Sequence, residues 1–99
     1  MFNIKSKTIP KSTGIYFFRN KHGKILYIGK AVNLRSRVSS YFNKRPKDTR
    51  ILKMLEMATN VTWQKTTSEI EALILESQLI KKHKPQFNVM LRDDKQYFY

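Results

Sequence analysis

The amino-acid sequence predicts a small α+β domain, and three observations support this fold class. Two short runs rich in β-branched and aromatic residues, 15–19 and 24–28, flank a polar segment with Asn20 and Gly23, which is typical of a β-hairpin. A third run, 61–66, has strand composition. Capping signals and helical spacing predict three helices, at 33–42, 49–58 and 68–84. Ninety-nine residues are enough for one domain.

The predicted hairpin carries one tyrosine on each strand, Tyr16 and Tyr27. A tight turn centred on residues 21 and 22 would place the two tyrosines directly opposite each other. A register shifted by two residues would keep both phenols on one face of the sheet, whereas a shift of one would separate them. The sequence therefore favours a tyrosine pair and leaves the register open. Ordinary packing of two strand aromatics is the alternative interpretation.

The helix expected at 33–42 begins with Asn33, a good N-cap residue. Leu34, Val38 and Tyr41 then follow at helical spacing and share one face. Arg37 lies one turn before Tyr41, on nearly the same side. A basic, turn-like break follows at 43–48, in which Asp48 can cap the next helix.

The third predicted helix starts with a capping box, in which Ser68 is the N-cap and Glu71 the N3 residue, and Pro85 marks its end. On a helical wheel Glu76 falls inside an apolar arc formed by Ala72, Leu73, Leu79 and Ile80. A carboxylate in such an arc is costly unless it is paired or bound to a metal. A salt bridge is one explanation for Glu76. A single Mg²⁺ held by this carboxylate, waters and a phosphate is the other.

The charge of the chain is its strongest global signal. Twenty Lys and Arg residues against seven Asp and Glu give a net charge of +13 and a pI near 10.2. A nucleic acid is the expected partner, because neutralised phosphates release counterions; a generic basic surface is the alternative. The basic residues are spread along the chain, which argues against a membrane surface. The absence of cysteine excludes disulfides and thiolate zinc sites.

The ends of the sequence bear on location and completeness. The first residues lack the apolar run of a signal peptide, and no stretch has the ~20 apolar residues that a membrane span needs, so a cytoplasmic protein is expected. The aromatic residues at 96–99 follow a turn-like segment directly. Residues 1–99 are therefore expected to form one domain that is a fragment of a longer protein.

No histidine offers an obvious general base, since His22 falls in the presumed turn and His83 among lysines near a helix end. A phenol has a pKa of about 10, which is too high for an efficient base at neutral pH. Cations nearby would lower this pKa, and Lys30 and Arg37 follow the hairpin closely enough to supply them.

At this point the residues resemble a known family. Gly14-Ile15-Tyr16, followed eleven residues later by Tyr27-Ile28-Gly29, is similar to the signature of GIY-YIG nucleases. The positions that also match are Lys30, Arg37, Tyr41, Glu76 and Asn88. The segments 29–31, 71–76, 79–82, 84–85, 87–89 and 91–95 look most like the N-terminal endonuclease domain of the excinuclease UvrC, over about residues 9–99. Thr13 replaces the proline that usually precedes the first glycine.

The resemblance implies a central three-stranded antiparallel sheet flanked by helices. It also implies phosphodiester hydrolysis with one divalent metal ion, Mg²⁺ or Mn²⁺, on Glu76. One signature tyrosine would act as general base. Tyr27, close to Lys30, is favoured over Tyr16. Arg37 and Lys30 would stabilise the phosphate charge.

The same resemblance implies that Tyr41 and Asn88 position groups nearby, and that Gly14 and Gly29 belong to the structural motif. A UvrC-type domain would cut damaged double-stranded DNA 3′ to a lesion, in a complex that UvrB has loaded, during nucleotide excision repair. The alternatives are a stand-alone Cho-like or homing-type GIY-YIG endonuclease, and a basic nucleic-acid-binding module without catalytic activity.

Overall fold

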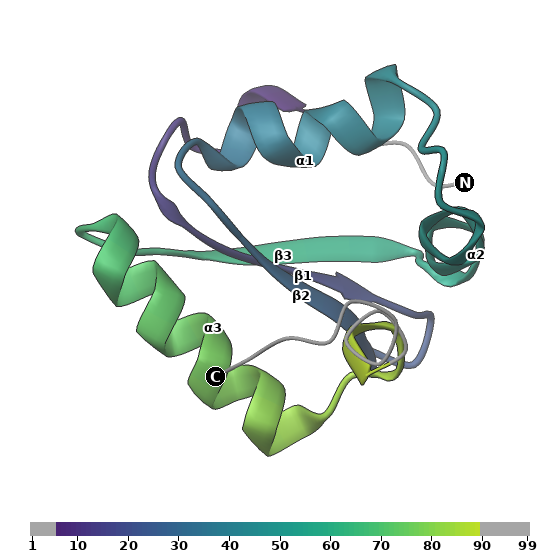
Figure 1. Ribbon diagram of the computed structural model, residues 1–99. Coiled ribbons are helices and arrows are strands. Elements are labelled where there is room, and N and C mark those ends of the chain that lie inside the picture. Colours follow the sequence, from purple (N-terminus) through teal and green to yellow (C-terminus); the bar gives the residue numbers. More distant parts are fainter. Residues whose placement is uncertain (1–5, 90–99) are drawn as a thin grey trace.

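The computed structural model describes residues 6–89, and it contains the α+β fold that the sequence predicts. Its elements in chain order are the short 3-10 helix η1 (Ser6–Thr8), the strands β1 (Gly14–Arg19) and β2 (Ile25–Ala31), the helices α1 (Leu34–Asn43) and α2 (Thr49–Met57), the strand β3 (Asn60–Lys65) and the helix α3 (Glu69–His83) (Figure 1). Residues 86–89 form a further helical turn.

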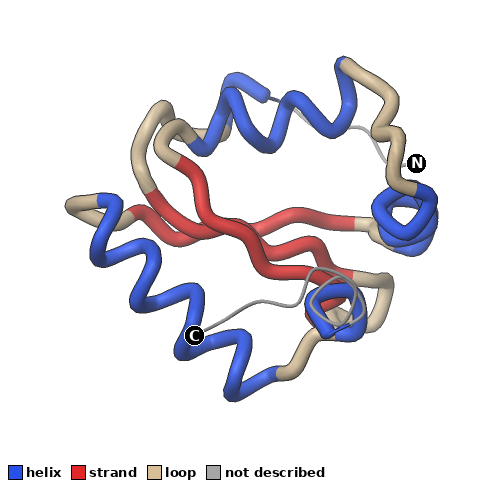
Figure 2. Tube along the Cα trace, in the orientation of Figure 1, coloured by secondary structure: helices blue, strands red, loops and turns tan. Residues whose placement is uncertain are grey.

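The three strands form one antiparallel sheet in the order β2-β1-β3, as the family resemblance implied. Helix α1 lies along one face of the sheet and α3 along the other, while α2 lies at one end (Figures 1 and 2). The central strand β1 is therefore covered on both faces, and a continuous apolar strand is expected there. Its even-numbered residues Tyr16 and Phe18 pack in the α1 layer, and its odd-numbered residues Ile15 and Phe17 pack in the α3 layer.

The hairpin register differs by two residues from that of a tight turn. Tyr16 is paired with Gly29, and Tyr27 with Phe18. Both tyrosines still project from the same face of the sheet, because a two-residue shift preserves side-chain parity. Of the registers that the sequence left open, the structure therefore has the one shifted by two residues, and the predicted shared face of Tyr16 and Tyr27 is confirmed.

A longer loop explains the register. Residues 20–24 connect the strands, and the Asn20 side chain accepts hydrogen bonds from the backbone N–H groups of His22 (2.9 Å) and Lys24 (3.0 Å). Gly23 has φ +80°, a left-handed conformation that glycine adopts without steric cost. The pairing is also irregular between Phe18 and Arg19, where one strand gains a residue.

The helix starts are fixed by the side chains that the sequence indicated. Asn33 accepts a hydrogen bond from Ser36 N (3.1 Å) to cap α1, Asp48 caps α2, and Ser68 accepts from Glu71 N (3.1 Å) to cap α3. The Glu71 carboxylate accepts from the Thr67 hydroxyl (2.8 Å), so it reaches the residue before the predicted cap. None of the described helices is long and apolar enough to cross a membrane.

The apolar arc predicted around Glu76 is only partly buried. Ala72 is buried, and Leu79 and Ile80 pack against the core. Leu73 is 48% exposed, because α3 turns this side of its surface away from the sheet. Leu73 belongs to the apolar arc by sequence but is not part of the buried core, which corrects the expectation of continuous apolar surroundings for Glu76. Positions 90–99, with their turn and terminal aromatics, lie outside the described residues.

Candidate active site

The two signature glycines are required by close packing. A Cβ on Gly29 would collide with Cζ and Oη of Tyr16, whose ring lies across this residue from the neighbouring strand. A Cβ on Gly14 would meet the Gln64 carbonyl oxygen and Leu34 Cδ1. Gly29 therefore leaves room for the Tyr16 ring, and Gly14 lets β1 approach both β3 and α1. These contacts fit the structural role that the family resemblance implies for Gly14 and Gly29.

Three polar side chains join the sheet to helix α1. The hydroxyl oxygens of Tyr16 and Tyr41 lie 2.7 Å apart and share a buried hydrogen bond. Arg37 Nη2 donates a hydrogen bond to the Tyr41 hydroxyl (3.3 Å), and the guanidinium carbon lies 5.0 Å from the centroid of the Tyr41 ring. Because Arg37 and Tyr41 are one helical turn apart, the helix itself sets this arrangement.

Burial sets the chemistry of Tyr16. Its side chain is 1% exposed, and desolvation, with the neighbouring Tyr41 and Tyr27, raises its pKa well above the usual phenol value. Partial burial acts to lower the pKa of Arg37, but Tyr16 and Tyr41 outweigh this effect and the pKa is raised. The guanidinium is therefore a permanent positive charge beside the phenols.

Tyr27 is the more accessible member of the tyrosine pair. It is half-buried, and its ring centroid lies 6.4 Å from that of Tyr16. It lines a groove of about 460 Å³ together with Arg37 and Tyr41. We call this the α1–α2 groove; its lining residues are Tyr27, Arg37, Ser40, Tyr41, Lys44, Arg45, Pro46, Lys47, Asp48 and Ile51.

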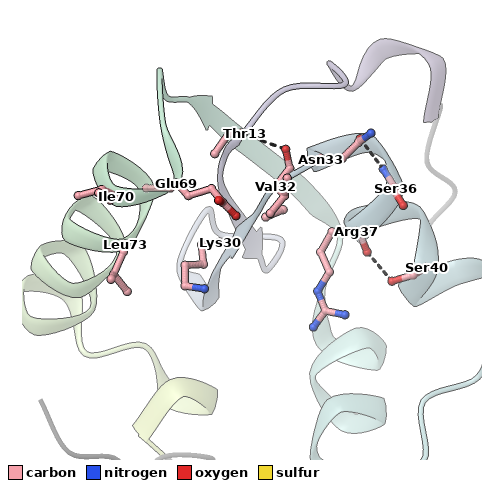
Figure 3. A pocket seen from close by; sticks show the side chains of 12 residues that line it. Thr13, Lys30, Val32, Asn33, Ser36, Arg37, Ser40, Glu69, Ile70 and Leu73 are labelled. Atoms are coloured by element: carbon pink, nitrogen blue, oxygen red, sulfur yellow. Dashed lines mark hydrogen bonds between the residues drawn. The ribbon is translucent and has the colours of Figure 1, made fainter.

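A second groove, of about 730 Å³, lies between helices α1 and α3 (Figure 3). Lys30 at the end of β2 and Arg37 on α1 both extend into it, and α3 contributes Glu69, Ile70 and Leu73 to the opposite wall. We call this the α1–α3 groove. Arg37 and Ser40 line both grooves, so the two hollows meet along the exposed side of α1.

Glu76 projects from α3 toward the end of β2. Its carboxyl is half-buried, and this burial raises its pKa, while the charge and backbone N–H of Lys30 act in the opposite direction. Among the described residues the one ion pair is Arg50–Asp48, so no cation of residues 6–89 forms a salt bridge with Glu76. Nor do the described residues contain three His, Cys, Asp or Glu side chains grouped around a metal position. A single carboxylate is enough to hold a hydrated Mg²⁺, because this ion often takes only one or two protein carboxylates and keeps its waters.

Asn88 is placed differently from the other candidate residues. Its Oδ1 accepts from Ile28 N (2.7 Å), and its Nδ2 donates to Ile28 O (2.9 Å). Strand β2 is at the edge of the sheet, so this side chain satisfies the outward-facing backbone groups between Tyr27 and Gly29. Asn88 thus holds β2, the strand that carries the second half of the signature, Tyr27-Ile28-Gly29.

The sequence-predicted residues therefore fall into three adjoining sets. Tyr16, Tyr27, Arg37 and Tyr41 form one cluster, Lys30 and Glu76 lie beside each other, and Asn88 supports β2 from its edge. The sequence pattern at 43–48 predicts only a turn, whereas in the structure Lys44, Arg45 and Lys47 line a groove together with Tyr41. Three cations within a few residues of Tyr41 are the signal in the sequence that could have indicated this.

Thr13, the one departure from the family pattern, lacks the stiff ring of the usual proline but fixes the entry to β1 through hydrogen bonds. Its hydroxyl donates to the Val32 carbonyl (3.1 Å), and its own carbonyl accepts from Thr66 N (2.9 Å). These bonds tie the entry to β1 to the segments that follow β2 and β3, where a proline would stiffen the backbone directly.

Comparisons with known proteins agree with this geometry. The family model of the UvrC-like GIY-YIG domain matches residues 12–89. UvrABC system protein C of Christiangramia forsetii is 51% identical over 94 residues, and that of Dictyoglomus thermophilum is 55% identical over 94 residues; these cover 95% and 94% of this chain. The matches cover 16% and 15% of those proteins, so the chain spans about one sixth of their length.

Among solved structures, the GIY-YIG N-terminal endonuclease domain of UvrC from Thermotoga maritima, bound to its catalytic magnesium, superimposes with a TM-score of 0.74. The two sequences are 38% identical, and the superposition covers 84% of this chain and 90% of the Thermotoga maritima chain. A point mutant of the same domain, also bound to its catalytic divalent cation, superimposes with a TM-score of 0.73. By sequence, fold and signature, this chain belongs to the family of UvrC-like GIY-YIG domains.

Proposed function

We propose that this chain is the endonuclease domain of a UvrC-type protein and hydrolyses DNA phosphodiester bonds with one divalent metal ion. The observation that carries the proposal is the convergence of a phenol cluster, two cations and one half-buried carboxylate at the place where α1, β2 and α3 meet. A basic binding module would not need a desolvated carboxylate there. The magnesium bound to the related Thermotoga maritima domain also supports the proposal.

Glu76 is the residue that would hold Mg²⁺ or Mn²⁺, with waters and a substrate phosphate in the remaining positions. When bound, the cation would act as a Lewis acid on the phosphate. Lys30 and Arg37 would add positive charge on the two sides of the same space, where charge develops during hydrolysis. Arg37 is already oriented by its hydrogen bond to Tyr41, so it needs little reorganisation.

Tyr27 is the general base in this proposal. A base must come within hydrogen-bonding reach of the attacking water. Tyr16 is 1% exposed, shares its hydroxyl with Tyr41, and has a pKa that burial raises, so it is poorly suited to this role. Tyr27 is half-buried and lines a groove beside the positively charged Arg37. Tyr16 would instead position Tyr41 and, through it, Arg37.

The substrate and partners follow from the relatives. Because the matching relatives are UvrABC system proteins, we infer that the substrate is damaged double-stranded DNA, cut 3′ to the lesion in nucleotide excision repair. The UvrB–DNA complex would present this substrate, and the cytoplasm is where it would be met. Residues 1–99 would then be one domain of a longer protein. The same relatives favour a UvrC-type domain over a stand-alone Cho-like or homing-type enzyme.

The test is a single-turnover incision assay on a lesion-containing duplex, with UvrB present and Mg²⁺ added. We expect Glu76→Gln to abolish cutting. Tyr27→Phe should slow it by about 10²- to 10⁴-fold, the usual contribution of a general base. Tyr16→Phe is the matched control and should be clearly less impaired. DNA binding should persist in all three variants. Wild-type cutting rates in both Glu76→Gln and Tyr27→Phe would refute the proposed mechanism.

A further inference from the structure

We propose that the α1–α2 groove is the DNA track of this domain: it holds the sugar–phosphate backbone that flanks the scissile phosphate. The inference rests on the proposed endonuclease function and adds the direction in which the DNA leaves the site. It is carried by the charge, exposure and anchoring of the residues that line this groove.

The charge of the α1–α2 groove is almost entirely positive. Four cations line it, Arg37, Lys44, Arg45 and Lys47, and the last three are exposed. Asp48 is the one carboxylate among the described lining residues. It is not available to oppose a phosphate, because it accepts from Arg50 N (2.8 Å) as the cap of α2 and pairs with the Arg50 guanidinium (3.0 Å).

The loop that carries these cations is anchored at both ends. The Lys44 backbone N–H donates to the Ser40 carbonyl (3.3 Å) at the end of α1, and Asp48 caps α2. Between them Pro46 fixes its own φ and restricts Arg45 to extended conformations. The loop backbone is therefore already restrained, and it loses less conformational entropy when the loop binds a ligand.

The α1–α2 groove is placed so that a DNA strand lying in it would lead to the tyrosine cluster. Tyr27, Arg37 and Tyr41 form its inner wall, and the basic loop forms its outer end. Along one DNA strand, phosphates recur every ~3.4 Å of helix axis, so three cations on a five-residue loop can neutralise two or three consecutive phosphates. Arg37, at the junction of both grooves, would contact the phosphate nearest to the reaction.

The α1–α3 groove has a different character. Apart from Lys30 and Arg37, its rim carries the exposed aliphatic side chains Val32 (65%), Ile70 (71%) and Leu73 (48%), and Glu69 adds a negative charge. Such a wall offers phosphates no partner. In Figure 1 the α1–α2 connection and α3 lie on different sides of the sheet. The DNA backbone therefore leaves the site over the α1–α2 loop, away from α3.

Two triple variants with equal charge test this inference. One removes the loop cations, as Lys44→Gln, Arg45→Gln and Lys47→Gln. The matched control removes three exposed lysines elsewhere, as Lys65→Gln, Lys81→Gln and Lys82→Gln. Each lowers the net charge by three from +13, so a non-specific charge effect would be the same in both. Binding is measured by fluorescence anisotropy of a labelled 20-base-pair duplex in EDTA, over a series of NaCl concentrations.

For the loop variant we expect the slope of log affinity against log salt to become shallower by about 2 to 3, since each lost phosphate contact removes about 0.9. The control should keep the wild-type slope to within about 0.5, less than one phosphate contact. Equal slopes for the two variants, or a larger change in the control, would overturn the inference.

A parallel incision assay in Mg²⁺ separates this inference from the endonuclease proposal. Incision by the wild type with equal slopes for the two variants would refute the track and leave the nuclease intact. A loop-specific change in slope without any incision by the wild type would refute the nuclease and retain the groove as a DNA-backbone surface.

Discussion

Gly29→Ala is the substitution that probes the signature most sharply. The added Cβ would occupy the space of the Tyr16 phenol. That ring cannot simply move aside, because Tyr16 is 1% exposed and its centroid lies 5.8 Å from Phe18 and 5.9 Å from Tyr41. We therefore expect the added methyl group to shift the phenol and break its hydrogen bond to Tyr41.

The expected magnitude follows from these two effects. Overpacking a filled core costs about 1–3 kcal/mol. Loss of the Tyr16–Tyr41 hydrogen bond adds about 0.5–1.5 kcal/mol. Gly29→Ala should therefore lower the free energy of unfolding by about 1.5–4.5 kcal/mol in total. Urea unfolding followed by the fluorescence of Trp63, the single tryptophan, measures this loss.

Gly23→Ala is the matched control, because a Cβ added at this position would meet nothing within 4 Å and the cost comes from its positive φ alone. We expect about 1–2 kcal/mol there. In addition, the cost of Gly29→Ala should largely vanish in a Tyr16→Leu background, since the colliding ring is gone. Equal losses for the two glycines, or full additivity with Tyr16→Leu, would refute the steric argument.

Three further predictions concern the elements around the site. Asn88→Ala should cost about 1–3 kcal/mol and speed hydrogen exchange at the Ile28 amide, because both edge hydrogen bonds are lost. Ser68→Ala should destabilise the domain by about 1 kcal/mol through the lost cap of α3, measured by urea unfolding. Burial raises the pKa of Glu76 in the folded state, so the metal-free domain should lose stability as pH rises from the unfolded to the folded pKa. Glu76→Gln should remove that loss and be the more stable protein at pH 7 without metal; urea unfolding between pH 4 and pH 7 would show an unchanged pH dependence if this reasoning is wrong.

The helix starts could be predicted from the sequence because capping is local. Asn33, Asp48 and Ser68 each satisfy a backbone N–H within three residues of themselves, so their identity and spacing carry the information. The hairpin register could not be predicted in the same way. It depends on how the Asn20 side chain closes a five-residue loop, and several loop lengths fit the same composition.

The candidate site was predictable as a set of residues, through the family resemblance, but not as an arrangement. Sequence alone could not separate Tyr16 from Tyr27, because both stand on one face of the sheet and only burial distinguishes them. The contacts of Asn88 are also long-range, since it binds the backbone of a residue sixty positions earlier. Such contacts depend on the packed fold.

The most direct test of the proposed one-metal mechanism is the position of a divalent cation. Crystals of this domain soaked in Mn²⁺ should give an anomalous-difference peak within about 2.5 Å of a Glu76 carboxylate oxygen, a limit that allows for positional error around the ~2.1 Å of a Mg²⁺–oxygen bond. We expect this peak to face Lys30 and to lie nearer to the Tyr27 hydroxyl than to that of Tyr16. A peak at another carboxylate with none at Glu76, or a peak nearer to Tyr16, would contradict the mechanism.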